Sequence, residues 1–78
     1  METLAELGIG AEARIARLEA PPSDALRLME MGLTPDAQVR VVRQAPLGDP
    51  LEVLVRGCRI SIRRADARAV ILSSDAHA

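Results

Sequence analysis

Few side chains in this chain could do covalent chemistry. The sequence holds one cysteine, Cys58, one histidine, His77, and no lysine. Nucleophilic catalysis needs a nucleophile beside a base, but His77 is next to last in the chain and Cys58 has no histidine available to activate it. The glycine-rich phosphate-binding loop that ends in lysine is also missing. We therefore expect no catalytic residues and no enzymatic activity.

Metal ligands are equally sparse. A structural zinc site takes about four cysteine or histidine ligands, and this chain offers two. We expect Cys58 to be a small buried apolar residue, because free cysteine is among the most buried residue types. His77 and Asp75 form a weak surface candidate that could capture a divalent ion between molecules. The sequence thus predicts no metal centre and no cofactor.

Length and composition indicate one small domain. The chain has 78 residues, of which 49% are hydrophobic and none is Phe, Tyr or Trp. A chain of this length supports a single core, and this core must be aliphatic. We expect one domain over residues 1–78, ordered over about residues 3–72, with 73–78 as a frayed tail. Surfaces that stack nucleic-acid bases or proline-rich peptides on aromatic rings are excluded.

The charge excludes further partner classes. The formal net charge of −1 gives no strong attraction to nucleic acid or to an anionic membrane. The charge is −4 over residues 1–36 and +4 over residues 37–64, although a solvated surface is the simpler interpretation. There is no signal-peptide pattern, no apolar run long enough to span a membrane and no second cysteine for a disulfide. We expect a cytoplasmic protein without membrane insertion.

The first part of the chain predicts a helical turn and then a strand. Thr3 and Glu6 have the spacing of a capping box, which favours a short turn of helix over residues 3–7. A weak alternation of apolar and polar residues predicts a strand over residues 12–19.

A helix is predicted next, with Ser23 as its N-cap. Gly32 suits the left-handed position just past the helix end, Leu33 then comes within reach of Leu28, and Pro35 follows as expected beyond a helix. The residues expected to share the inward face are Ala25, Leu26, Leu28 and Met29.

The second half of the chain predicts a strand, a loop and a hairpin. Residues 37–44 alternate as a strand, and residues 45–50 are dense in turn formers. If Arg56 and Gly57 are the central residues of a tight turn, the strand residues on either side pair apolar with apolar. These pairs are Val55 with Cys58, Val53 with Ile60 and Leu51 with Ile62.

The remaining segments complete a mainly β fold. A single helical turn is expected over residues 63–66 and a final strand over residues 67–72. The sum is a small five-stranded antiparallel sheet with one α-helix inserted after the first strand. Partial closure into a barrel would protect its edges.

Two apolar side chains are expected at the surface. Met31 falls on the polar side of the helix, beside Asp24 and Arg27. Leu47 stands at the tip of the 45–50 loop, where a rigid turn would present it at little entropic cost to a partner. The alternative is that Leu47 folds back as a plug over the barrel end, and the sequence does not separate these two interpretations.

Three segments together resemble the FeoA family. They are 32–35 (Gly-Leu-Thr-Pro), 45–50 (Ala-Pro-Leu-Gly-Asp-Pro) and 55–64 (Val-Arg-Gly-Cys-Arg-Ile-Ser-Ile-Arg-Arg), with Ala67 following. Their order and spacing match the family pattern over about residues 3 to 72. The departures are Asp36 in place of the commoner glycine, Met31 in place of leucine, Ala13 where glycine is frequent, and Cys58 where an aromatic residue often stands.

The resemblance implies an SH3-like barrel and a role in bacterial ferrous iron uptake. FeoA is thought to act as a non-enzymatic cytosolic accessory that contacts FeoB, the membrane iron permease with a GTP-binding domain. The same barrel forms the C-terminal domain of iron-dependent repressors, so a metal-responsive regulatory module is the alternative function. A small barrel with a free edge could also pair weakly with a second copy.

We expect contact with FeoB through the helix end and the 45–50 loop. The candidate contact residues are Arg27, Met31, Leu33, Pro46, Leu47, Gly48, Asp49 and Pro50. The residues expected to shape the turns are Gly32, Pro35 and Gly57.

Overall fold

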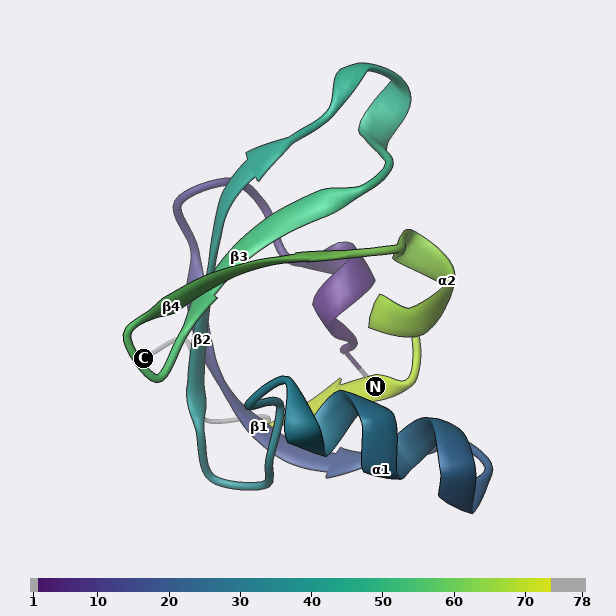
Figure 1. Cartoon of the computed structure of the whole chain (residues 1–78). Coiled ribbons are helices and arrows are strands. Elements are labelled where there is room, and N and C mark those ends of the chain that lie inside the picture. Colours follow the sequence, from purple (N-terminus) through teal and green to yellow (C-terminus); the bar gives the residue numbers. More distant parts are fainter. Residues whose placement is uncertain (1, 74–78) are drawn as a thin grey trace.

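A computed structural model describes residues 2–73 of the chain and shows a mainly β fold (Figure 1). The predicted tail beyond residue 73 lies outside the described residues. In chain order the elements are η1 (Leu4–Glu6), β1 (Glu12–Leu18), α1 (Pro22–Glu30), β2 (Gln38–Gln44), η2 (Pro46–Gly48), β3 (Leu51–Val55), β4 (Cys58–Ile62), α2 (Arg64–Ala67) and β5 (Val70–Leu72).

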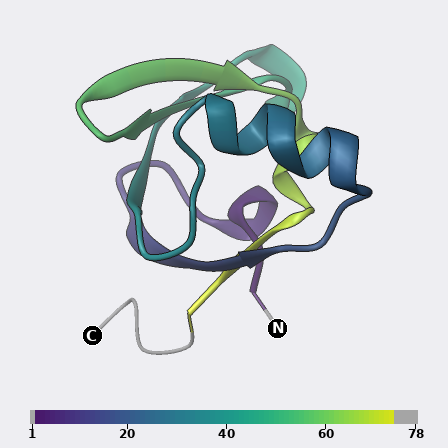
Figure 2. The same cartoon turned by 60° about the horizontal axis from the view of Figure 1, so that its bottom comes forward.

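The five strands form one antiparallel sheet in the order β4-β3-β2-β1-β5. The pairing register shifts between Ile15 and Arg17 in β1 and between Val41 and Arg43 in β2. Bulges of this kind bend a strand and increase its twist. The sheet therefore curls around the core, as the partial closure predicted from the sequence requires (Figures 1 and 2).

The two edge strands of the sheet, β5 and β4, differ in their backbone pairing. The N-terminal segment lies along β5, where Thr3 forms a bridge with Ile71 and the N–H of Leu72 donates to the carbonyl of Glu2 at 2.9 Å. On the other side β4 pairs, among residues 2–73, with β3 alone. An unpaired edge is a template for further pairing, so the described part of the chain covers the β5 edge and not the β4 edge.

The predicted hairpin is confirmed residue by residue. Val55 pairs with Cys58, Val53 with Ile60 and Leu51 with Ile62. Arg56 and Gly57 both have positive φ, 51° and 78°, as a type I′ turn requires at its two central residues. The apolar pairing pattern was therefore sufficient to fix the register.

The core is aliphatic and draws on every strand. Among residues 2–73 no polar or charged residue is buried. The fully buried side chains of largest volume are Leu4, Ile15, Leu28, Leu33, Leu51, Ile62, Val39, Val41, Val53, Val55 and Val70.

The N-terminal turn agrees with the sequence, and the last strand is shorter than expected. The N–H of Thr3 donates to Oε1 of Glu6 at 2.9 Å, as in a capping box. The predicted helical turn after β4 is α2. Its hydrogen bonds continue to the N–H of Ala69, which donates to the carbonyl of Asp66 at 3.0 Å, so β5 begins only at Val70 rather than at residue 67.

The start and the inward face of α1 were predicted incorrectly. The helix begins at Pro22, with Pro21 rather than Ser23 at the N-cap. A proline suits the first helical position because its missing N–H would have no partner there. Leu28 is the one fully buried residue of α1, whereas Leu26 and Met29 are exposed. In Figure 2 α1 is drawn between the β3–β4 hairpin and β1. Leu28, in its last turn, is the residue that reaches the core.

The end of α1 is the predicted one. Gly32 has φ of 103°, and its N–H donates to the carbonyl of Met29 at 2.9 Å. The N–H of Leu33 reaches back to the carbonyl of Leu28 at 3.1 Å, and both leucines are buried. This is the Schellman motif with its apolar contact, and it turns the chain from α1 toward β2.

We expect Gly32→Ala to lower the free energy of unfolding by about 1–2 kcal/mol, because an L-residue is strained at this φ. Space is not the reason, since an added Cβ would lie 3.5 Å from Cγ1 of Val55. Gly8→Ala is the matched control, with nothing within 4 Å and no positive φ, and should change stability little. Urea unfolding of both variants tests this, and equal effects would contradict the role of Gly32.

Candidate partner-binding site

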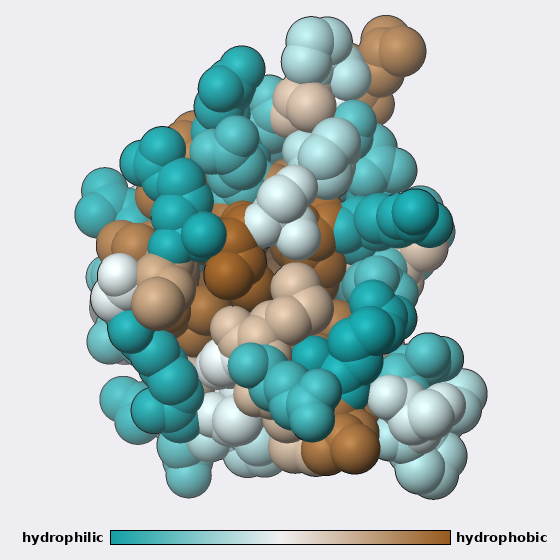
Figure 3. Space-filling model, in the orientation of Figure 1, coloured by the Kyte–Doolittle hydropathy of each residue, from teal (hydrophilic) through white to brown (hydrophobic). Residues whose placement is uncertain are grey.

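The 45–50 loop projects from the top of the molecule in Figure 1. Leu47 is fully exposed, at 104% of its reference area, so the plug interpretation is wrong. Figure 3 shows apolar surface at the tip of this projection. The loop thus offers a leucine that makes no contribution to the core.

The loop holds Leu47 in an uncommon backbone conformation. Leu47 has φ of 71°, in the left-handed region that leucine rarely adopts, and Gly48 follows with φ of 82°. The N–H of Gly48 donates to the carbonyl of Ala45 at 2.8 Å, and the N–H of Ala45 donates to the carbonyl of Pro50 at 3.0 Å. These two bonds close the loop on itself and fix the direction of its tip.

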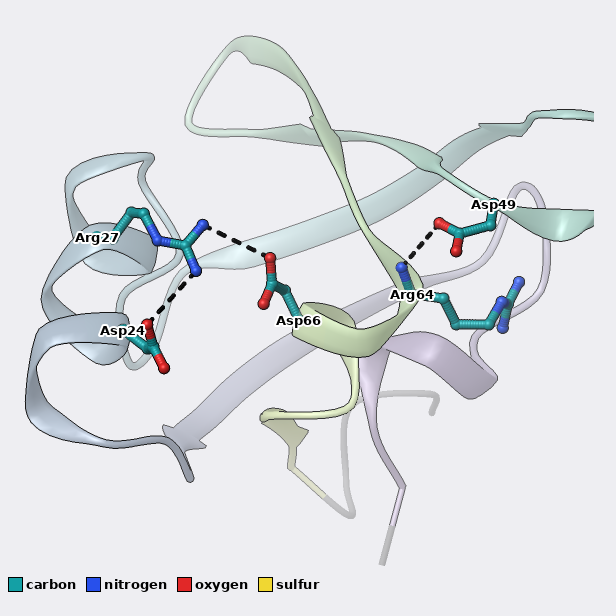
Figure 4. A network of polar contacts seen from close by, with 5 residues as sticks. All are labelled: Asp24, Arg27, Asp49, Arg64 and Asp66. Atoms are coloured by element: carbon teal, nitrogen blue, oxygen red, sulfur yellow. Dashed lines mark hydrogen bonds and ion pairs between the residues drawn. The ribbon is translucent and has the colours of Figure 1, made fainter.

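Arg64 of α2 supports the loop from behind. Its Nε donates to the carbonyl of Gly48 at 2.9 Å, and its backbone N–H donates to Oδ1 of Asp49 at 3.0 Å (Figure 4). Nη1 of the same side chain donates to the carbonyl of Ala5 in η1. One half-buried arginine therefore joins the loop, α2 and the N-terminal turn. Sequence reasoning missed this residue.

Arg27 is also held by α2. Its guanidinium lies 3.6 Å from Oδ2 of Asp66 and 3.7 Å from Oδ1 of Asp24 (Figure 4). The side chain is about half exposed, at 53%, so these ion pairs contribute little stability. They do orient the guanidinium toward α2.

The helix end does not present the expected residues. Leu33 is fully buried and is not accessible to a partner. Met31 is half-buried and packs against the core, which corrects the prediction that it is exposed. Pro35, which follows in this turn, is exposed.

The structure does not combine the helix end and the loop into one surface. In Figure 1 α1 lies at the bottom and the 45–50 loop at the top. The candidate site therefore reduces to Pro46, Leu47, Gly48, Asp49 and Pro50, with Arg64 as their support.

The turn at 32–35 is held by the hairpin. Nε of Arg56 donates to Oγ1 of Thr34 at 3.2 Å, and Nη2 of Arg56 contacts the same oxygen. Gly32 and Gly57, both with positive φ, thus shape two turns that lie side by side.

The described residues include no cluster of metal ligands. No group of three or more His, Cys, Asp or Glu side chains in that range could hold a metal ion. Cys58 is exposed, so the prediction of a buried cysteine is wrong. It is the first residue of the edge strand β4, beside the hairpin turn, and no other described residue buries it. Asp75 and His77 lie outside the described residues. No helix in the described part of the chain is long and apolar enough to cross a membrane.

Comparison with known proteins identifies the fold and the family. The family model described as FeoA domain matches residues 2–74. A fusion of Fe(2+) transport protein A with the Fe(2+) transporter FeoB, from Porphyromonas gingivalis, is 36% identical over 76 residues. That match covers 94% of this chain and 9% of the fusion protein, so the chain corresponds to a small part of that relative.

Two solved structures agree closely. The solution structure of FeoA from Chlorobium tepidum is 38% identical, with a TM-score of 0.84, over 91% of this chain and 68% of that chain. The crystal structure of Stenotrophomonas maltophilia FeoA complexed with zinc, described as an SH3 domain protein, is 30% identical. Its TM-score is also 0.84, over 97% of this chain and 94% of that chain. The fold is therefore SH3-like.

The likeness to metal-dependent repressors is one of fold alone. A manganese-dependent transcriptional repressor has a TM-score of 0.83 but is 19% identical, over 92% of this chain and 35% of that chain. Similarity at this level does not favour the regulatory alternative. The SH3-like fold, the FeoA domain match over nearly the whole chain and the two FeoA structures together show that this chain belongs to the FeoA family.

Proposed function

We propose that the protein is a non-enzymatic cytosolic accessory of ferrous iron transport that acts by contacting the FeoB permease. The observation that carries this proposal is Leu47, fully exposed on a loop that Arg64 braces from behind. A side chain held ready in one orientation loses little entropy when a partner covers it.

Family membership and the fusion relative support FeoB as the partner. In the Porphyromonas gingivalis protein the two components are one polypeptide. Covalent linkage keeps two domains at high effective concentration, which is useful when they work by touching each other. We extend this association to the present chain and place its contact at the 45–50 loop.

The main test replaces the apolar tip. Leu47→Asp should lower the amount of FeoB that co-purifies with this protein by about ten-fold or more, because a carboxylate would be desolvated in an apolar contact. Its own free energy of unfolding should not fall, since the side chain is fully exposed and aspartate adopts the left-handed φ of this position more readily than leucine.

Ile9→Asp is the control for this test. Ile9 is also exposed, at 62%, but lies in the turn between η1 and β1, outside the loop. It should leave FeoB recovery unaffected. If Leu47→Asp and the natural chain recover equal amounts of FeoB, the loop is not part of the contact and this proposal is wrong.

The support that Arg64 gives to the 45–50 loop is tested separately. Arg64→Lys keeps the charge but loses the planar fork that reaches Gly48 and Ala5 together. The backbone order parameters of Leu47 and Gly48 should then fall from about 0.85 to below about 0.6, as measured by NMR relaxation. FeoB recovery should decrease although Leu47 is still present.

Arg68→Lys is the matched control for Arg64→Lys. Arg68 is an exposed arginine at the end of α2 and should leave the loop rigid. If the loop stays rigid in Arg64→Lys, the 45–50 turn positions Leu47 without the hydrogen bonds of Arg64, and the proposed role of Arg64 is wrong.

A further inference from the structure

The outer face of β2, β3 and β4, with the adjoining end of β1, is a second surface of defined composition. Strand pairing places Arg40 directly beside Leu54, and Leu54 directly beside Arg59. Next to this row runs a second one, Arg43 beside Glu52 and Glu52 beside Ser61. We call this the outer sheet face. Its members are Glu12, Arg14, Gln38, Arg40, Arg43, Glu52, Leu54, Arg59 and Ser61.

The outer sheet face is positively charged in a chain that is not. Its four arginines and two glutamates give it a formal charge of +2, whereas the whole chain carries −1. Residues 37–64, which carry +4 in sequence, supply most of these side chains. The fold therefore keeps part of the charge segregation of the sequence on one surface.

The ion pairs on this face leave positive charge unmatched. Glu52 lies between two arginines, 3.8 Å from Nη1 of Arg43 and 3.7 Å from Nη1 of Arg59. One carboxylate thus serves two guanidinium groups, each on a side chain that is 67% exposed. Arg40 stands directly opposite Glu12 in the pairing register, yet within residues 2–73 it has no carboxylate within 4.0 Å.

Leu54 supplies an apolar position among these charges. It is 38% exposed and has an arginine on the neighbouring strand at each side. An arginine side chain can pack its apolar stem against such a residue while its guanidinium stays in water. The face therefore offers an apolar contact framed by donors suited to carboxylates.

We propose that the outer sheet face binds an acidic segment of a partner protein, in which carboxylates flank an apolar side chain. The carboxylates would pair with Arg40, Arg43 and Arg59, and the apolar side chain would cover Leu54. Glu12 and Glu52 lie within the face and would repel a uniform array of negative charge such as nucleic acid or an anionic membrane. A protein segment can place its carboxylates to avoid them. The residues of this surface do not include Leu47 or the 45–50 loop, so the proposal stands independently of the function proposed above.

The probe is the synthetic peptide Glu-Glu-Leu-Glu-Glu, whose first, third and fifth side chains share one face when it is extended, added to the full chain at low salt. Amide chemical shifts measured by NMR should change saturably on β2, β3 and β4, and less on α1 and α2. Arg40→Glu should weaken binding about ten-fold, because it replaces an attraction with a repulsion at the centre of the face. Leu54→Ser should weaken it several-fold with the charge unchanged.

Arg68→Glu separates a local effect from a general one. It makes the same change in net charge at an exposed site on α2, and it should retain nearly the affinity of the natural chain. The proposal is wrong if Arg68→Glu and Arg40→Glu weaken binding equally, if the shifts lie elsewhere, or if no binding occurs. It is also wrong if phosphatidylserine vesicles or duplex DNA bind this face more tightly than the peptide does. Circular dichroism of each variant confirms that it is folded.

Discussion

The core of this protein must be filled without a single aromatic ring, and much of the structure follows from that constraint. Inward side chains such as Val39, Val41, Val53 and Val55 are short, so the strands must curl tightly to exclude water. The interior then has room for one residue of α1, Leu28, and for Leu33 just beyond it. The other apolar residues of the helix stay outside. Leu47 also lies outside this small interior.

Sequence reasoning succeeded where the determining contacts are local. The hairpin register follows from apolar pairs across a two-residue turn, and the end of α1 follows from a glycine and a leucine at fixed positions. In both cases the residues that decide the geometry lie within a few positions of one another.

Sequence reasoning failed where depth of burial or distant contacts decide. Alternation correctly placed Cys58 on the inward side of β4, but β4 is an edge strand and its first residue is exposed. Alternation predicts the side of the strand on which a residue lies, but not whether other residues bury it there. The candidate site shows the same division: the loop was evident from its turn formers, while its support by Arg64 was not. That side chain reaches a carbonyl 16 positions earlier and another 59 positions earlier, and no local pattern encodes such contacts.

The pairing of the N-terminal segment with β5 bears on the order in which the fold can assemble. Glu2 and Thr3 find their backbone partners at Leu72 and Ile71, and β1 pairs with β5 through Ile15 and Leu72. The bridge between Thr3 and Ile71 and the pairing of β1 with β5 can form only after β5 has been synthesised. Contacts of such long sequence separation slow folding, because the loop entropy is lost before the contact forms. The hairpin of β3 and β4 can form first, and the pairing of the N-terminal segment and β1 with β5 is expected to close the sheet last.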